Sequence, residues 1–188
     1  SGLYASLVIP VPSNQRLQEL PIRVAAALAS FVSVVVRGDC RIKWPNDLVV
    51  GRRKLGGILV DAVSPPSPAE SWAIVGFGLN YATPDTAVLE GATSVLEEAG
   101  RSGAAPPPFA RFVAEATSAV WRAVTSDEPG WVENFSVLSA HRAGDPIRFR
   151  LDGEVVEGRF GGFDAHGFLR LETDSGMRLV RSGEVFSW

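Results

Sequence analysis

The sequence predicts an α+β fold, in which a β-sheet is flanked by helices and a small SH3-like β-barrel follows at the C-terminus. Apolar runs of strand length alternate with stretches of helical periodicity over the first three quarters of the chain. Beyond that point the apolar period changes to two, and glycines separate short segments. The 188 residues suffice for one main domain and a small second one. We place the domains at residues 1–142 and 143–188.

The predicted elements begin with a strand over Leu3–Ile9, which ends at Pro10 and Pro12. Pro21 suits the first position of a helix, so a helix is predicted from there to about Val36. This helix is apolar nearly all round, which predicts that it is buried against a sheet.

The remaining elements are predicted from apolar spacing and turn residues. Thr93 is expected to cap a short helix through Leu96, and the Ser/Pro-rich residues 64–71 are expected to form a loop. Longer helices are predicted over residues 109–125 and 131–138. Strands are predicted over residues 41–43, 48–50, 55–63 and 72–79, and in the barrel over 147–151, 155–163, 168–173 and 177–181.

Composition argues against several classes of function. A net charge of -3 does not favour a nucleic-acid partner, and no uninterrupted apolar run approaches the roughly 20 residues that span a bilayer. The single cysteine, Cys40, excludes an internal disulfide and is compatible with a reducing compartment. The two histidines, His141 and His166, are far apart in sequence, which argues against a His/Cys metal site.

The stretch "KWPND" (43–47) is the first candidate for a functional site. It also fits an ordinary turn, because Asn and Asp are common turn residues and Pro45 favours an extended residue before it. In the functional interpretation, the turn directs Lys43, Asn46 and Asp47 at one spot. Residue types leave both interpretations open.

The stretch "RKLGGIL" (53–59) places Lys54 at the head of an apolar strand, with two glycines directly after Leu55. Such a lysine is often a surface residue whose stem covers apolar neighbours. Glycine within a strand, however, often marks the close approach of a ligand. A bulge in a crowded sheet remains the structural alternative.

The stretch "IVGFGLN" (74–80) is the third candidate. Gly76, Gly78 and Asn80 occupy alternate positions and therefore face the same side of a strand. Close packing of a helix would explain the small residues equally well. Together, the three stretches predict a narrow apolar slot with a charged mouth, which suits an acid with an apolar body. No histidine lies near these three stretches in sequence to activate a Ser or Cys nucleophile, so the expected chemistry is electrostatic stabilisation during adenylyl transfer.

The motifs "KWPNDL", "RKLGGIL" and "GFGLN", in this order and spacing, resemble the catalytic domain of biotin protein ligases. "GLYASL", "ATSVLEEAG" and the terminal barrel fit the same family, so the resemblance spans essentially the whole chain. It implies a mixed sheet of the class II synthetase-like biotin/lipoate ligase fold. It also implies ATP- and Mg²⁺-dependent activation of biotin to biotinyl-5′-AMP in the cytoplasm. Biotin would then pass to a lysine of a biotin carboxyl carrier protein, a subunit of acetyl-CoA carboxylase.

The resemblance also implies roles for individual residues. Lys54 is expected to be catalytic and to bridge the biotin carboxylate and the α-phosphate. Asp47 would either contact nucleotide and Mg²⁺ or orient the incoming carrier lysine. A Mg²⁺ site near Asp47 and Asn80 is left open. Residues expected at biotin are Leu3, Ser6, Lys54, Gly57, Ile58, Gly76 and Gly78, and those expected at ATP are Lys43, Trp44, Asn46 and Asn80.

One family motif is not in this sequence. The Gly-Arg-Gly-Arg biotin loop of the family lies upstream of "GLYASL", and this chain opens at Ser1. We therefore expect a preceding segment, and weak biotin affinity and poor activity for this chain by itself. Two other functions remain open, a lipoate or octanoate ligase or transferase of the same fold and a non-catalytic module that senses a ligand or dimerises. No nucleic-acid or membrane partner is expected, and a homodimer is left open.

Overall fold

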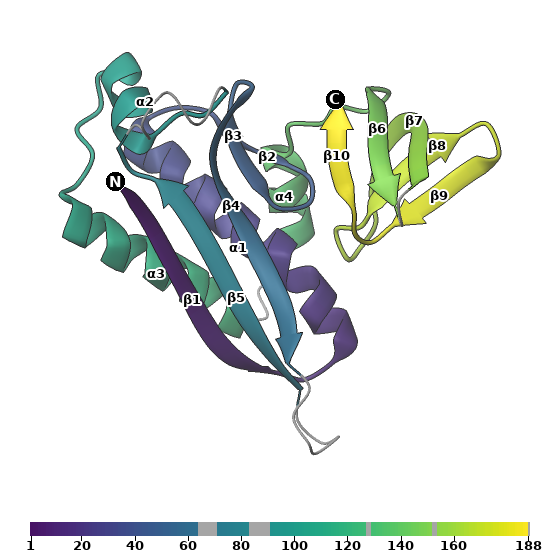
Figure 1. Ribbon diagram of the computed structural model, residues 1–188, viewed down its shortest axis with the longest axis horizontal. Coiled ribbons are helices and arrows are strands. Elements are labelled where there is room, and N and C mark those ends of the chain that lie inside the picture. The colour runs from purple at the N-terminus through teal and green to yellow at the C-terminus, as the bar shows by residue number, and fades with distance from the viewer. Residues whose placement is uncertain (64–70, 83–90, 127–128, 152–153, 188) are drawn as a thin grey trace.

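The computed structural model describes residues 1–63, 71–82, 91–126, 129–151 and 154–187 (Figure 1). Most of the predicted 64–71 loop lies outside these ranges. The first sheet contains β1 (Gly2–Val11), β2 (Cys40–Lys43), β3 (Asp47–Val50), β4 (Arg53–Val63) and β5 (Ser71–Asn80). The helices are α1 (Asn14–Val36), α2 (Val95–Ser102), α3 (Phe109–Thr125) and α4 (Trp131–Leu138). The second sheet contains β6 (Pro146–Leu151), β7 (Glu154–Phe163), β8 (Leu169–Thr173), β9 (Gly176–Val180) and β10 (Glu184–Ser187).

The first sheet has the strand order β1-β5-β4-β3-β2, and α1 and α3 lie behind it in Figure 1. The second sheet, in the order β10-β6-β7-β8-β9, forms the C-terminal part of the molecule. The predicted α+β class with a small β unit at the C-terminus is thereby confirmed. Neighbouring strands of the first sheet pair antiparallel, and parallel contacts occur as the isolated bridges Ile42–Ser139 and Lys54–Ala92. The domain boundary at 142/143 stays a prediction.

Helix α1 begins seven residues before the predicted start. Ser13 caps it, because the Ser13 Oγ accepts a hydrogen bond from the Arg16 N–H at 3.1 Å. Pro21 lies inside the helix, where its missing N–H removes one hydrogen bond of the first turns. The prediction that Pro21 starts the helix was therefore wrong. By length and apolarity α1 could also cross a membrane, but more than half of its most apolar window is buried inside the protein.

The short helix α2 is capped by Ser94 and not by Thr93 as predicted. The Ser94 Oγ accepts from the Glu97 N–H at 3.3 Å, whereas the Thr93 hydroxyl donates to the Glu98 carboxylate. Helices α3 and α4 occupy the ranges predicted from apolar spacing. Periodicity thus located these helices, while the choice between two adjacent capping residues depended on side-chain contacts.

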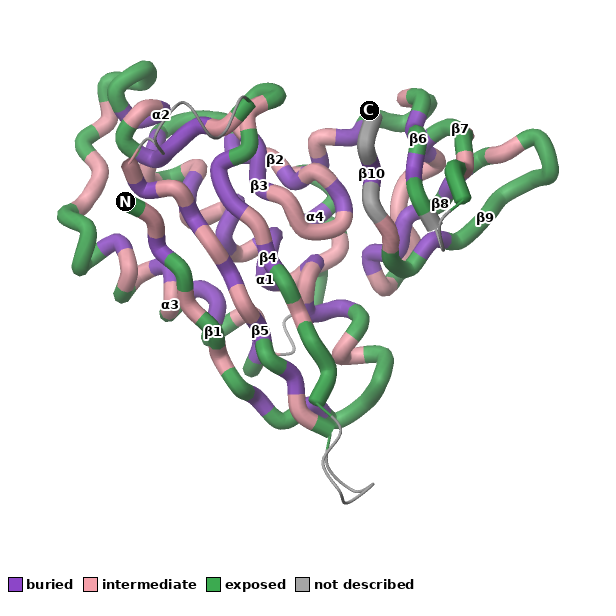
Figure 2. Tube along the Cα trace, in the orientation of Figure 1, coloured by how far each residue is buried: buried purple, intermediate pink, exposed green. Residues whose placement is uncertain are grey.

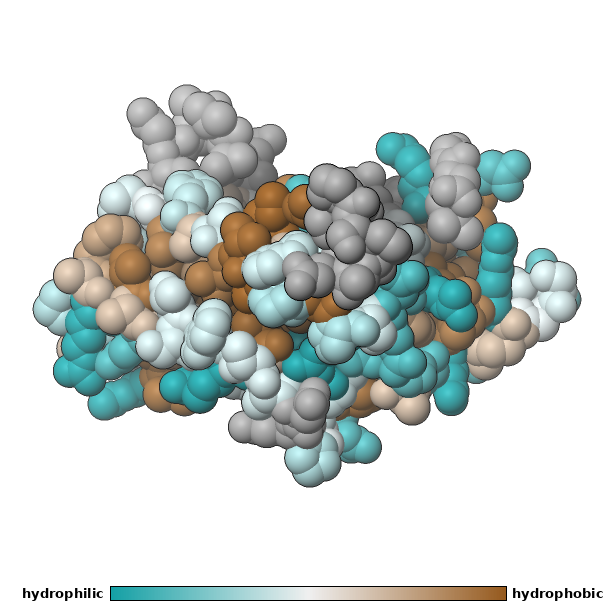
Figure 3. Space-filling view, turned by 90° about the horizontal axis from the view of Figure 1, so that it is seen from below, coloured by the Kyte–Doolittle hydropathy of each residue, from teal (hydrophilic) through white to brown (hydrophobic). Residues whose placement is uncertain are grey.

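One hydrophobic core lies between the first sheet and its helices and continues into the C-terminal sheet (Figure 2). Helix α1 contributes Leu20 and Leu28, and β5 contributes Val75 and Leu79, all fully buried. The opposite face of the sheet exposes apolar side chains, namely Tyr4, Val8, Leu59 and Ile74. Seen from below, the larger apolar areas lie toward the side of the first sheet and its helices (Figure 3). The candidate site opens on the face of the first sheet that carries Tyr4 and Leu59.

Candidate functional site

A cavity of about 800 Å³ opens on the exposed face of the first sheet, where β1, β4 and β5 meet the turn between β2 and β3. It brings together most of the residues that the sequence nominated from separate motifs. Those that line it are Ser6, Asn46, Asp47, Lys54, Gly57, Ile58, Gly76, Gly78 and Asn80.

The floor of the cavity is bare main chain. Gly57 pairs with Gly78 across β4 and β5, and Gly76 pairs with Ser6 across β5 and β1. A Cβ atom built on Gly57 would lie 3.2 Å from Asp47 Oδ1 and 3.6 Å from Lys54 Nζ. The absence of side chains at these positions therefore leaves room for a ligand directly below the charged groups.

Lys54 lines the cavity, and Lys43, which is not among the lining residues, lies on the other side of Asp47. Lys54 Nζ lies 2.5 Å from Asp47 Oδ1, and Lys43 Nζ lies 4.0 Å from Asp47 Oδ2. The Lys54 side chain is 55% exposed, so solvent screens this ion pair and its contribution to stability is small. Two cations beside one carboxylate leave a net positive charge, which favours an anionic ligand.

The main chain of Lys54 is held by the segment before α2. The Lys54 N–H donates to the Gly91 carbonyl at 2.8 Å, and the Lys54 carbonyl accepts from the Thr93 N–H at 2.9 Å. Asn80 Nδ2 in turn donates to the Thr93 carbonyl at 3.1 Å. In this structure Asn80 therefore supports the strand that carries Lys54.

The sequence analysis did not predict a charged cluster that lies next to Lys54. Arg53 places one guanidinium nitrogen 2.7 Å from Glu97 and another 2.7 Å from the buried Glu98, whose carboxylate also accepts from the Thr93 hydroxyl. The hydrogen bond from Arg101 and the charge of Arg53 lower the pKa of Glu97. The adjacent carboxylates in "ATSVLEEAG" were the available signal.

The structure places Leu3 and Trp44 away from the cavity. Leu3 is buried, because it lies an odd number of residues from Ser6 and so faces the opposite side of β1. The same alternation places the exposed Tyr4 on the cavity side, where a Cβ on Gly78 would lie 3.1 Å from its ring. The predictions that Leu3 contacts biotin and that Trp44 contacts ATP were therefore wrong for this cavity, because neither side chain lines it. Tyr4 does line the cavity and was not predicted, although strand alternation could have indicated it.

The donor set does not fit a metal held by protein side chains alone. Among the described residues, no group of three or more His, Cys, Asp or Glu side chains is arranged to hold a metal ion. Among the residues that the structure describes, Asp47 is the carboxylate that lines the cavity, and its two oxygens face Lys54 and Lys43. Magnesium in such sites usually takes substrate phosphates as ligands as well.

The turn that carries Asn46 and Asp47 is held from both sides. Asn46 Nδ2 donates to the Ile58 carbonyl at 2.7 Å, and the Ile58 N–H donates to the Asn46 carbonyl at 2.9 Å. On the other side, the Trp44 N–H donates to Nε2 of the buried His141 at 3.0 Å. Burial lowers the pKa of His141 to about 4, so at neutral pH its ring is uncharged and can accept this bond.

The buried His141 predicts a loss of stability in mild acid. Its folded-state pKa lies below the ordinary value of 6.5, so the unfolded state binds more protons and stability falls as the pH drops from about 6.5 toward 4. We expect His141 to account for a loss of about 2 kcal/mol between pH 7.5 and 5. Urea unfolding at both pH values tests this. The loss should be smaller by that amount in His141→Phe, and an equal loss in both proteins would contradict the assignment.

The sequence of this chain is similar to those of known ligases. Residues 1–80 match the family model described as biotin/lipoate A/B protein ligase family, and residues 144–188 match that of the biotin protein ligase C terminal domain. The biotin–[acetyl-CoA-carboxylase] ligase of Paracoccus denitrificans is 31% identical, in a match that covers 99% of this chain and 80% of that protein. The chain belongs to the biotin protein ligase family.

Other biotin protein ligases match at lower identity. The bifunctional ligase/repressor of Bacillus subtilis is 25% identical over 98% of this chain, which spans 58% of that protein. The biotin protein ligase of Aquifex aeolicus has the same fold, with a TM-score of 0.79 at 17% identity over 98% of this chain and 81% of that one. Its structure in complex with biotin and ATP matches with a TM-score of 0.74 at 18% identity, over 98% of this chain and 77% of that chain.

Proposed function

We propose that this biotin protein ligase activates biotin with ATP to biotinyl-5′-AMP. It then transfers biotin to a specific lysine of the biotin carboxyl carrier protein of acetyl-CoA carboxylase. The observation that carries the proposal is the Lys54 ammonium, which lies over the bare main chain of Gly57 at the mouth of an apolar cavity. The related ligase of Paracoccus denitrificans is named for the same reaction class. Because the reaction uses ATP, we expect it in the cytoplasm.

In the first step, a biotin carboxylate oxygen attacks the α-phosphorus of ATP, and the bond from that phosphorus to the pyrophosphate oxygen breaks. Negative charge accumulates between the carboxylate and the phosphate. Lys54 would stabilise this charge from a fixed position, without a proton transfer. The cavity floor at Gly57, Gly76 and Gly78 would accommodate the apolar part of biotin, with Ser6 and Ile58 beside it.

In the second step, the amine of the carrier lysine attacks the acyl carbon of the adenylate, an amide bond forms and AMP leaves. Asp47 lies beside Lys54 and would either contact the nucleotide or orient the incoming amine. Asn46, Asn80 and Lys43 are the further residues that we assign to the nucleotide side. Mg²⁺ would supply charge neutralisation to the ATP phosphates, with those phosphates among its ligands.

Direct assay of carrier biotinylation tests the proposal. The protein in its full natural length is incubated with biotin, ATP, Mg²⁺ and the carrier domain, and mass spectrometry detects the added biotin. We expect biotinylation that depends on ATP and on the acceptor lysine of the carrier. An intact, folded protein that binds biotin but leaves the carrier unmodified would instead support a non-catalytic sensing module.

Lipoate or octanoate is the competing substrate class, because the family model that matches residues 1–80 includes lipoate ligases. Competition calorimetry with biotin and lipoate separates the two. We expect biotin to bind more tightly, and tighter binding of lipoate would overturn the choice of substrate.

A further inference from the structure

The C-terminal sheet contacts the turn of the candidate site through Trp44. The Trp44 side chain is fully buried, and its indole N–H donates to the Gly167 carbonyl at 3.2 Å. Its ring centroid lies 6.4 Å from that of Phe149 on β6. With the bond to His141, the two N–H groups of Trp44 thus bond to residues 97 and 123 positions further along the chain.

The His141 contact belongs to a segment that lies alongside β2. Ser139 forms a parallel bridge with Ile42, and the Ala140 N–H donates to the Ile42 carbonyl at 2.9 Å. The His141 ring then reaches the Trp44 N–H at the end of β2. The connection between α4 and β6 therefore continues the first sheet by one short parallel contact, which ends at the turn.

The Gly167 contact belongs to a stiff loop between β7 and β8. Gly167 has a φ of +75°, and a Cβ there would lie 3.1 Å from Ile22 Cγ2 on α1. Asp164 Oδ1 accepts from the N–H groups of His166 and Phe168 at 2.8 and 2.9 Å, which fixes the loop. Glycine is suited to this position because both its conformation and the space disfavour a side chain.

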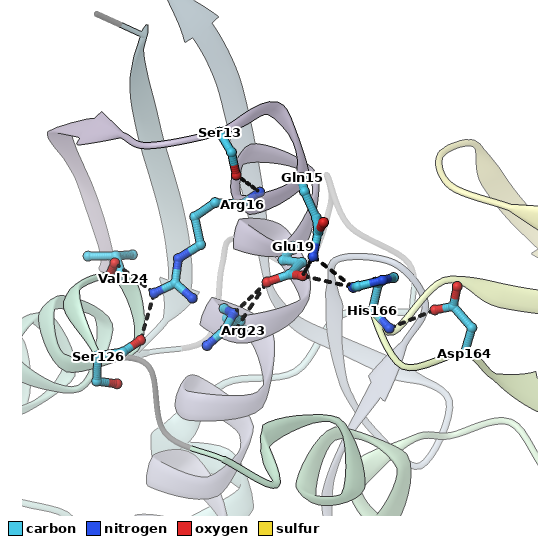
Figure 4. A network of polar contacts seen from close by, with 9 residues as sticks. All are labelled: Ser13, Gln15, Arg16, Glu19, Arg23, Val124, Ser126, Asp164 and His166. Atoms are coloured by element: carbon cyan, nitrogen blue, oxygen red, sulfur yellow. Dashed lines mark hydrogen bonds and ion pairs between the residues drawn. The ribbon is translucent and has the colours of Figure 1, made fainter.

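The same loop is joined to α1 by a second contact that does not touch the turn (Figure 4). His166 Nδ1 lies 3.1 Å from Oε1 of the buried Glu19, which also binds Arg23. The His166 side chain therefore joins the loop to Glu19 and Gln15 on α1, whereas the His141 side chain binds Trp44. His166 offers a matched control for any effect that passes through the turn.

We propose that Trp44 and His141 are positioning residues, through which the C-terminal sheet and the connection between α4 and β6 hold the turn that places Asp47 against Lys54. Trp44 is three residues before Asp47, whose carboxylate lies 2.5 Å from the Lys54 amine. Loss of the Trp44 contacts would let the turn shift, and the distance between Asp47 and Lys54 would change with it. The expected effect on adenylate formation rests on the proposed function, whereas the expected change in the distance between Asp47 and Lys54 does not.

The kinetic test compares variants of the full-length protein. His141→Phe removes the acceptor, His141→Gln retains an acceptor on a side chain of similar reach, and Trp44→Phe removes the indole donor. We expect His141→Phe and Trp44→Phe to lower kcat for adenylate formation by about 10- to 100-fold, because small misplacement of reacting groups is costly. The KM for biotin should change by less than about threefold, since the cavity floor is untouched. His141→Gln should recover much of the loss, and His166→Gln should stay near wild type.

A second readout follows the Lys54 amine directly. Reductive ¹³C-methylation labels Lys43 and Lys54, together with the N-terminus and any lysine outside residues 1–188, and the variants Lys43→Arg and Lys54→Arg assign the two signals. We expect His141→Phe to move the Lys54 signal in the same direction as Asp47→Asn, which removes the charge of the pair. If His141→Phe does not fold, Trp44→Phe provides the same comparison.

Two results would overturn the inference. One is a Lys54 signal and a kcat that stay at wild-type values in His141→Phe and Trp44→Phe while Asp47→Asn moves the signal. The other is an equal effect of His166→Gln, which would show a general response to loosening the junction. Failure of the wild-type protein to form any adenylate would contradict the proposed function instead, and the Lys54 signal would still decide the positioning role.

Discussion

Lys54→Ala is expected to lower kcat/KM for biotinyl-adenylate formation by at least roughly 150-fold, or about 3 kcal/mol of transition-state stabilisation. The reason is that charge builds up between the biotin carboxylate and the α-phosphate, and Lys54 is the cation that lies over the cavity floor. Pyrophosphate release in a continuous assay measures the first step. Single-turnover transfer from preformed adenylate measures the second.

Stability should not explain this loss. The Lys54 side chain is more than half exposed, so its removal leaves no cavity in the core, and the melting temperature should stay within a few degrees of wild type. Lys54→Arg keeps the charge but changes its shape, and we expect it to recover only part of the activity. Full activity in Lys54→Ala would show that another group performs the electrostatic role.

Gly76→Val is expected to weaken biotin binding by at least about 100-fold while the protein stays folded. A Cβ on Gly76 would make ordinary contacts, 3.5 Å from the Leu59 carbonyl oxygen and 3.6 Å from Ser6 Oγ, so the strand can accept it. The two methyl groups would then occupy the cavity. Calorimetric titration with biotin gives the affinity, and Gly76→Ala should show a smaller loss.

Gly56→Ala is the structural counterpart of this test. Its Cβ would lie 2.3 Å from the Gly78 carbonyl oxygen and 2.8 Å from Leu79 Cδ2, so β4 and β5 would have to separate. We expect a loss of about 3 kcal/mol or more in the free energy of unfolding. Gly56 on β4 would thus be required for strand packing, and Gly76 on β5 would be required to leave space for the ligand. Strong biotin binding by Gly76→Val would refute the second assignment, and a fully stable Gly56→Ala would refute the first.

Local patterns predicted most elements of the fold. Apolar spacing located α3 and α4, and the strands around the three motifs lie within a few residues of their predicted bounds. The start of α1 was misplaced because Pro21 is a strong local signal for a first helical position, whereas the hydroxyl of Ser13 makes the observed cap. Such choices between adjacent signals depend on contacts that no single residue type reveals.

The candidate site was predicted to a similar extent. Alternation along a strand places Gly76, Gly78 and Asn80 on one face without any tertiary information, and these residues do line the cavity. The same rule separates Leu3 from Ser6, which the resemblance had grouped together. The family to which the chain belongs was also evident from motif order alone.

The sequence by itself therefore determined which chemical groups are available and which face of a strand each one occupies. The alternation of side chains along a strand and the preference of certain residues for turns are properties of neighbouring residues, so both can be deduced from the amino-acid sequence. Only the tertiary structure decided that Trp44 is buried away from the cavity and bonded to His141 and Gly167. Contacts between segments 97 and 123 residues apart arise from how the C-terminal sheet and the connection between α4 and β6 pack against the first sheet, and local patterns do not encode that packing.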